Sequence, residues 1–313
     1  MTKSIVIAVG GNSLIIDPKH QSIADQYAAV SATSRRIASI IERGNRVVIT
    51  HGNGPQVGFI LLRSELARKE IHTVPLDSCV ADTQGAIGYN FQMALTNELL
   101  RHKLHVPVAT VITQVVVDRH DSAFKKPVKP IGSFYSKKEA DHRMSKDGWE
   151  MMEDAGRGWR RVVASPQPRE IIELEAIRLL ISKGVVVIAV GGGGIPVVRD
   201  TRGNLHGVEA VIDKDYASSL LASKLNADIF LISTAVEKVY LNYGKNNQRG
   251  IDKITLKEVK RYIKAGHFKE GSMLPKIKAC VSFLESGGKR AIITDPDKME
   301  LAIEGLAGTQ IVK

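Results

Sequence analysis

The chain has 313 residues, 43% hydrophobic and 25% charged, which fits a globular protein with one large α/β domain or two lobes. The formal net charge of +11 suits a phosphate-bearing partner. Aromatic residues make up only 5%, and this low content argues against a nucleic-acid partner whose bases would stack on aromatic side chains. Cys79 and Cys280 stand outside any paired motif, and no apolar run is long enough to cross a bilayer. We therefore expect no disulfide framework, no membrane partner and a cytoplasmic location.

Two strand–glycine–helix units open the chain. A short apolar run at residues 5–9 ends at Gly10 and Gly11, and a helix is expected over 23–43. The pattern recurs with a strand at 46–50, a glycine turn at 51–55 and a helix at 56–70. Such repeated units predict a parallel sheet wrapped by helices, with ligands beyond the carboxyl ends of its strands.

The composition changes after a helix expected at 82–100 and a mostly strand-like stretch at 106–117. Residues 119–161 contain 11 Lys or Arg and 7 Asp or Glu residues, with prolines at 127 and 130. The segment is too long for a simple connection. We interpret residues 118–164 as a protruding lid subdomain inserted in a single domain that spans 1–313, although a solvated basic insertion explains the composition equally well.

A central unit follows a helix expected at 171–182. The run at 185–190 has the pattern of a strand buried on both faces, and four glycines, 191–194, follow it. The chain then reaches Asp213-Lys214-Asp215 and enters a helix expected at 216–225. A lysine between two aspartates beside such a turn suggests a phosphate site in which carboxylates position the lysine.

The remaining elements continue the α/β alternation. Strands are expected at 228–233 and 291–294, and residues 236–243 fit an edge of the sheet. Helices are expected at 256–265 and at 299–303. A further helix is expected to follow the Gly-Ser-Met segment at 271–273 and to end at 285.

Familiar nucleotide fingerprints are missing. Gly244-Lys245 and Gly288-Lys289 lack the Ser or Thr of a Walker A motif, and Pro196 breaks the dinucleotide pattern. The chain also lacks the motifs of protein kinases, zinc hydrolases and serine hydrolases.

What remains is three glycine turns after strands, together with Lys129, Lys214 and Lys276. Each feature alone is common, but as a set they suit phosphoryl transfer, which needs backbone donors and cations more than covalent chemistry.

Eight blocks of the sequence resemble the carbamate kinase family, in the family's order and from about residue 5 to about residue 312. They lie at 10–12, 50–58 (Thr-His-Gly-Asn-Gly-Pro-Gln-Val-Gly), 84–89, 129–132, 160–163, 191–196, 207–215 (ending Val-Ile-Asp-Lys-Asp) and 271–273. The resemblance implies the amino-acid-kinase fold, a three-layer αβα sandwich with a mainly parallel open sheet, and a homodimer. It also implies reversible conversion of ATP, ammonia and carbon dioxide, joined as carbamate, to ADP and carbamoyl phosphate with Mg²⁺. We expect the reaction to run toward ATP in catabolism.

The resemblance also implies roles for individual residues. The catalytic group would be Lys129, Lys214, Asp215 and Lys276, in which the lysines neutralise phosphate charge and Lys129 reaches in from the subdomain. The transferring phosphoryl group and carbamate would be held by Gly10, Gly11, Asn12, Gly52, Asn53 and Gly54. The nucleotide would contact Gly191, Gly192, Ser233, Ala235, Val239, Tyr240, Tyr243, Met273 and Pro275. No protein ligand to a metal is expected.

Some positions depart from the family pattern. Ala164 stands where proline is expected, and Ala235 lies in a segment that lacks an aspartate common in the wider superfamily. Ala8 occupies the place of a superfamily lysine, a charge that Lys129 would supply instead. A kinase of another carboxylate, such as acetylglutamate, and a non-catalytic nucleotide sensor on the same fold are the alternatives.

Overall fold

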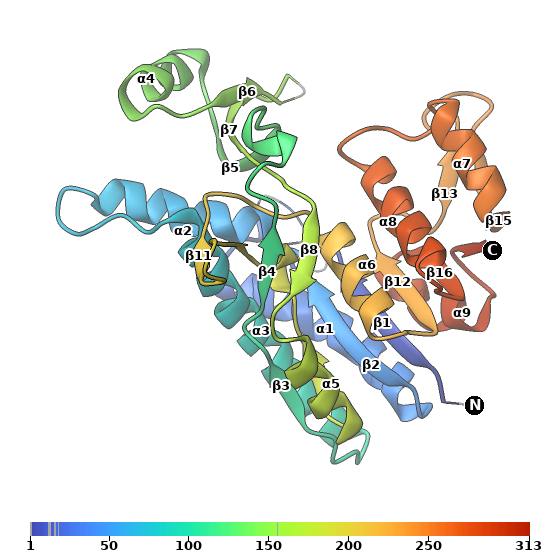
Figure 1. Ribbon diagram of the computed structural model, residues 1–313. Helices are drawn as coiled ribbons and strands as arrows, with labels where there is room; N and C mark the ends of the chain where they lie inside the picture. Colours follow the sequence, from blue (N-terminus) through green and yellow to red (C-terminus); the bar gives the residue numbers. More distant parts are fainter. Residues whose placement is uncertain (1, 12–13, 16, 18, 155) are drawn as a thin grey trace.

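A mainly parallel sheet forms the centre of the computed structural model, which describes residues 2–11, 14, 15, 17, 19–154 and 156–313 (Figure 1). Among the described residues, the strand order is β15–β17–β16–β12–β1–β2–β9–β3. Every neighbouring pair is parallel except β16 and β17, which are antiparallel to each other. The strands are β1 Ser4–Val9, β2 Arg46–His51, β3 Val108–Thr110, β9 Val186–Ile188, β12 Ile229–Ser233, β15 Lys253–Thr255, β16 Arg290–Thr294 and β17 Thr309–Val312.

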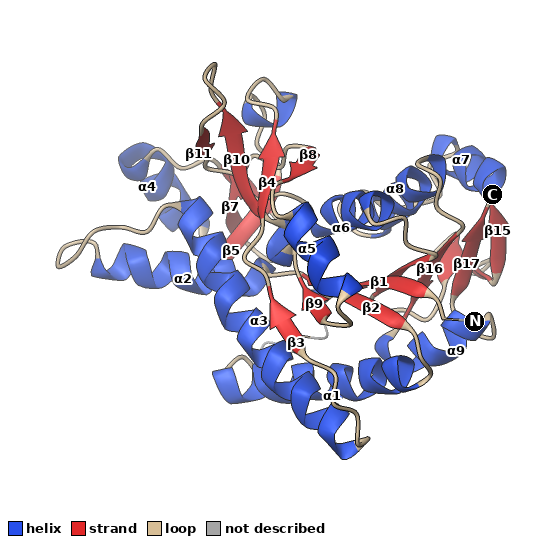
Figure 2. Ribbon diagram, turned by 60° about the horizontal axis from the view of Figure 1, so that its bottom comes forward, coloured by secondary structure: helices blue, strands red, loops and turns tan. Residues whose placement is uncertain are grey.

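Helices cover both faces of this sheet (Figure 2). Ile5, Ile7 and Val9 of β1 pack into a core with α1 Ile23–Glu42, α3 Leu76–Arg101 and α9 Met299–Glu304. Val6 and Ala8 point into the opposite core, which includes α5 Leu174–Ser182, α6 Lys214–Lys224, α7 Leu256–Lys264 and α8 Met273–Glu285. Because both faces of β1 are buried, its sequence is continuously apolar. The expected three-layer sandwich is confirmed.

Two smaller sheets stand beyond the carboxyl edge of the main sheet. One contains β11 Leu205–Gly207, β10 Ile195–Arg199, β4 Gln114–Val117 and β8 Pro168–Ile171, in that order. The other consists of β5 Lys129–Tyr135, β7 Trp159–Val163 and β6 Met151–Glu153, with α4 Lys137–Asp147 beside it. In Figure 1 this second unit projects above α2 Gly54–Ala67, across from the lobe of α7 and α8. It lies within the segment predicted to protrude.

Three elements differ from the sequence predictions. The strand-like stretch at 106–117 is divided between two sheets, because the side chain of Gln84 binds both the N–H and the carbonyl of Thr113 and turns the chain there. Residues 236–243 do not continue the main sheet: β13 Val239–Leu241 pairs with β14 Arg249–Ile251, and the Val239 N–H donates to Thr309 Oγ1. The helix expected from residue 82 begins six residues earlier, at Leu76.

Candidate functional site

The three glycine turns follow β1, β2 and β9, which are neighbours in the main sheet, so the carboxyl ends of these strands bring the turns together. Val9 of β1 is in register with His51 of β2 on one side and with Ser233 of β12 on the other. Gly10 follows so closely on β12 that a Cβ atom there would lie 2.6 Å from the Ser233 carbonyl oxygen. A Cβ on Gly11 would meet no described atom within 4 Å. Asn12, predicted to bind substrate, lies outside the described residues.

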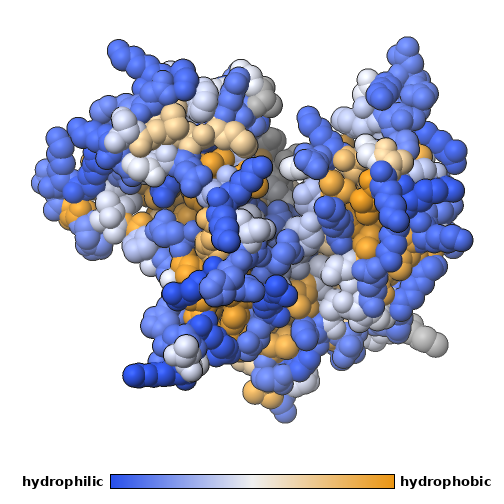
Figure 3. Space-filling view, turned by 45° about the horizontal axis from the view of Figure 1, so that its top comes forward, coloured by the Kyte–Doolittle hydropathy of each residue, from blue (hydrophilic) through white to orange (hydrophobic). Residues whose placement is uncertain are grey.

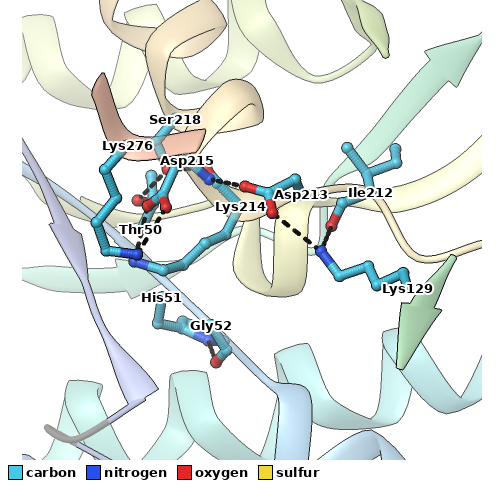
Figure 4. Close-up of polar contacts among 10 residues, drawn as sticks. All are labelled: Thr50, His51, Gly52, Lys129, Ile212, Asp213, Lys214, Asp215, Ser218 and Lys276. Carbon is cyan, nitrogen blue, oxygen red and sulfur yellow. Dashed lines mark hydrogen bonds and ion pairs between the residues drawn. The ribbon is translucent and has the colours of Figure 1, made fainter. Parts of the chain in front are cut away.

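Lys214, Asp215 and Lys276 form one buried charge cluster (Figure 4). Lys276 Nζ donates to Asp215 Oδ2 at 3.2 Å, and Lys214 Nζ lies 3.0 Å from Asp215 Oδ1. Asp215 therefore holds two ammonium groups, one from the start of α6 and one from α8. Among the described residues, Lys214 Nζ has no partner in hydrogen-bond geometry although it is buried. A buried ammonium with unused donors is suited to a ligand that carries acceptors, such as a phosphate.

The charge states of this cluster follow from burial and proximity. Burial lowers the pKa of Lys214 below its ordinary value, and Lys276 lowers it further, against the opposing effect of Asp215. Burial alone would raise the pKa of Asp215, but the two ammonium groups outweigh burial and lower it to about 2. Asp215 is therefore ionised at neutral pH.

Lys129 reaches the same region from the first residue of β5. Its Nζ lies 3.2 Å from Asp213 Oδ2 and 3.5 Å from the Ile212 carbonyl oxygen (Figure 4). Asp213 is also the N-cap of α6, because its Oδ1 accepts the Asp215 N–H at 2.9 Å. All three predicted lysines are thus grouped around the N-terminus of α6.

Three polar residues that sequence reasoning did not assign support this arrangement. Thr50 Oγ1 lies 2.6 Å from Ser218 Oγ, which donates to the Lys214 carbonyl oxygen at 2.6 Å and so links β2 to α6. Asn53 Nδ2 donates to Thr83 Oγ1 at 2.8 Å. The position of Ser218, four residues after Lys214, was the only sequence signal for the first link.

Gly191 and Gly192 pack against the loop at residues 51–53, which is called the acceptor loop below because the acceptor is assigned to it under the proposed function. A Cβ atom on Gly191 would come within 2.5 Å of the His51 ring, and one on Gly192 within 2.2 Å of the Asn53 amide. Gly192 also has a φ of +66°, which favours glycine. These glycines therefore allow His51 and Asn53 to approach the tetraglycine turn. Among the described residues, Gly191 and Gly192 do not line the cavity described next.

That cavity, of about 320 Å³, opens between β12 and α8 next to Lys276. It is lined by Thr234, Ala235, Val236, Tyr240, Tyr243, His267, Phe268, Lys269, Ser272, Met273 and Lys276. Four of the predicted nucleotide residues, Ala235, Tyr240, Tyr243 and Met273, are in this set. Figure 3 shows apolar side chains on the lobe at right, which a groove separates from the subdomain.

The other predicted nucleotide residues lie outside this lining. Val239 is in the core with an exposed fraction of 1%, because the alternation of β13 turns its side chain inward. Ser233 is fully buried at the end of β12, and Pro275 lies in the first turn of α8. His267, Phe268 and Lys269 were missed because they come from a loop without a periodic pattern.

The fold and the site define a phosphoryl-binding α/β protein, and the chain belongs to the amino acid kinase family, whose family model matches residues 3–295. Within it, the chain is 49% identical to a carbamate kinase-like protein, YahI, of Escherichia coli, with 100% of both chains covered. It is 48% identical to a carbamate kinase of Thermococcus kodakarensis over 99% of each. The structure of carbamate kinase from Giardia lamblia bound to AMP-PNP superposes with a TM-score of 0.94 at 41% identity, covering 100% of this chain and 99% of that one.

Among the described residues, no helix is both long and apolar enough to span a membrane.

Proposed function

We propose that this protein is a carbamate kinase that transfers a phosphoryl group reversibly between ATP and carbamate. The observation that carries the proposal is the Lys214–Asp215–Lys276 cluster, in which a buried ammonium has donors left for a ligand at the carboxyl edge of the sheet. Relatives that are named carbamate kinases and are 46–49% identical over almost the whole chain support the choice of acceptor.

The two substrates would approach the lysines from opposite sides. We assign the base and ribose of the nucleotide to the cavity that contains Tyr240, Tyr243 and Met273, with its phosphates directed to Lys276 and Lys214. We assign the acceptor to the glycine turns, at Gly10, Gly11, Gly52, Asn53 and the start of α2 at Gly54. Asn12 remains a prediction for this side. Gly191 and Gly192 support the acceptor loop in this proposal, rather than the nucleotide.

The chemistry requires charge compensation more than proton transfer. Carbamate is an anion with an oxygen nucleophile, so attack on the γ-phosphoryl group forms one P–O bond while the bond to ADP breaks, and no strong general base is needed. Mutual repulsion of the anions is the main barrier. Lys214, Lys276 and Lys129 would offset this repulsion, and Asp215 would hold two of the three ammonium groups in position.

We assign Mg²⁺ to the phosphates of the bound nucleotide. In the described part of the chain, no group of three or more His, Cys, Asp or Glu side chains could hold a metal ion. Both carboxylates beside the lysines are engaged, Asp213 by Lys129 and Asp215 by two ammonium groups. Mg²⁺ bound by phosphate oxygens and water would need no protein ligand here, and when bound it would offset phosphate charge.

We also propose a homodimer that uses the open edge of the main sheet. There, Tyr89 and Ile112 have exposed fractions of 61% and 46%, and they line a hollow of about 380 Å³ between α3 and β3. A second copy that covers this face would bury both side chains. The remaining proposals are a subdomain that acts as a lid, a cytoplasmic location, where ATP and ADP are available, and net flux toward ATP in catabolism.

The test is ATP formation from ADP, Mg²⁺ and carbamoyl phosphate in a coupled assay. We expect Lys276→Ala to lose about 3 kcal/mol of transition-state stabilisation, about a 100-fold drop in rate, by analogy with loss of one oxyanion donor. Lys278→Ala, at an exposed position on the same helix, is the matched control and should keep the wild-type rate. Synthesis that survives in Lys276→Ala would refute the role of that lysine.

Two further measurements, of acetylglutamate phosphorylation and of ADP binding, separate the alternatives. Phosphorylation of acetylglutamate, without ATP formation from carbamoyl phosphate, would identify another carboxylate kinase. ADP binding without any turnover would identify a sensor.

A further inference from the structure

We propose that Asp213 is a positioning residue that holds the Lys129 ammonium at the phosphoryl site before substrate arrives. The inference rests on the proposed kinase function and assigns a residue to which no role has been given above beyond capping α6. It starts from the carboxylate of Asp213, whose two oxygens have different partners. Oδ1 accepts the Asp215 N–H at 2.9 Å, and Oδ2 pairs with Lys129 Nζ at 3.2 Å.

The site needs a second counter-ion because three ammonium groups converge on one helix N-terminus. Asp215 is already shared by Lys214 and Lys276. The N-terminus of a helix carries partial positive charge and disfavours a cation. Without Asp213, the only described polar contact that Lys129 would keep is the one at 3.5 Å between its Nζ and the Ile212 carbonyl oxygen, and its flexible side chain would extend into solvent. Asp213 supplies the attraction that keeps it at the site.

The backbone places the two partners together independently of the outer part of the subdomain. Lys129 is paired with Val163 across β5 and β7. The next residue, Ala164, forms a bridge with Ala210, and its carbonyl oxygen accepts the Val211 N–H at 3.0 Å. Two residues later comes Asp213. Lys129 therefore lies where the subdomain joins the rest of the protein. The backbone pairing from β5 through β7 to residues 210 and 211 places it beside its counter-ion, Asp213.

The pair is also suited to release. The side chains of Lys129 and Asp213 have exposed fractions of 26% and 28%, so water screens the attraction. A bound phosphoryl group, which carries more charge than one carboxylate, can compete for Lys129. Asp213 then remains as the cap of α6, and the helix that carries Lys214 and Asp215 is not disturbed.

The test uses substitutions that separate charge from capping. Asp213→Asn keeps the shape and a good N-cap but removes the charge, whereas Asp213→Ala removes both. For Asp213→Asn we expect kcat/KM for carbamoyl phosphate to fall about tenfold, with an unchanged KM for ADP and an unchanged urea midpoint. In the Lys129→Ala background, Asp213→Asn should cause no further loss, because its effect acts through Lys129.

A wild-type value of kcat/KM in Asp213→Asn, or independent losses in the double variant, would overturn the proposal. A second readout does not need activity: the rate at which amine reagents modify Lys129 in the substrate-free protein, measured by mass spectrometry. Lys129 should react faster in Asp213→Asn, whereas the exposed Lys126 should not change. Equal rates at Lys129 would refute the pairing. If the wild type forms no ATP but Lys129 still responds, the proposed reaction fails and the positioning role stands.

Discussion

His51 shows how one buried side chain keeps the acceptor loop in place while remaining uncharged. Its exposed fraction is 1%, and its ring stacks on Phe91 with centroids 6.0 Å apart. Nδ1 lies 2.9 Å from the Gly52 carbonyl oxygen, which can only accept, so Nδ1 carries the proton of the neutral ring. Burial lowers the pKa of His51 from 6.5 to about 4, and the nearby Lys214 ammonium contributes in the same direction.

This pKa predicts a specific acid sensitivity of the fold. Below pH 6.5 the unfolded chain binds the His51 proton and the folded chain does not, so stability is lost as the pH falls from 6.5 to 4. The loss from this one group is about 3 kcal/mol. His51→Asn retains a donor near Gly52 but cannot titrate. We expect it to lower stability at pH 7 and to show a shallower loss toward pH 4 than the wild type, as measured by urea unfolding.

The control for this prediction is His142→Asn, at an exposed position on α4, which should follow the wild-type pH dependence. Acidic groups shared by all three proteins cancel in the comparison. Parallel stability curves for the wild type and His51→Asn would show that His51 does not titrate in this way.

At the level of elements, α2 and the subdomain are joined at two points. Asp147 of α4 receives Arg143 at 2.7 Å and Arg68, from the end of α2, at 2.8 Å. Nearer the site, Gly58 of α2 approaches Gly132 of β5 so closely that a Cβ atom on Gly58 would lie 2.4 Å from the Gly132 Cα. Since α2 begins next to Asn53, we infer that the subdomain and this helix move as one body.

Removing the outer attachment should loosen α4 without unfolding the protein. In Asp147→Asn, both arginines lose their nearer ionised acceptor and keep, among the described residues, only Glu65 of α2, at 3.5 Å from Arg68 and 3.7 Å from Arg143. We expect amide exchange in α4 to become about tenfold faster while α1 is unchanged. High salt should have a similar effect on the wild type, because it screens the ion pairs. Asp141→Asn, which removes an exposed pair with Lys137 on the same helix, is the control. Equal exchange in all three proteins would contradict the two-point attachment.

At the level of the whole molecule, the proposed dimer can be tested by mass. The chain weighs 34.2 kDa, so a homodimer has twice that mass in light scattering. Tyr89→Glu would place a charge in the buried contact, and we expect it to shift the protein to the monomer at micromolar concentration. Leu179→Glu, at an exposed site on α5, should leave the dimer intact. A monomeric wild type, or a dimer unaffected by Tyr89→Glu, would reject this face.

The sheet could be predicted because its strands are buried on both faces and their sequences are therefore continuously apolar, as β1 and β12 show. The lysines were identified from motifs, and the structure brings them together around α6. Which carboxylate each lysine meets could not be predicted, because Lys129 and Asp213 are far apart in sequence and become neighbours through the bridge at Ala164. The glycine turn at 191–194 was interpreted as part of a phosphate site, and its close packing against His51 and Asn53 was not predicted.

The position of β1 in the middle of the sheet has a consequence for how the chain reaches this state. One neighbour, β2, is made soon after β1, but the other, β12, follows more than 200 residues later, as the pairing of Ile5 with Ile229 shows. Contacts of such long sequence separation slow folding. During synthesis the apolar strand β1 therefore has one unpaired edge until β12 is made. We expect nascent chains to depend on chaperones until β12 has emerged.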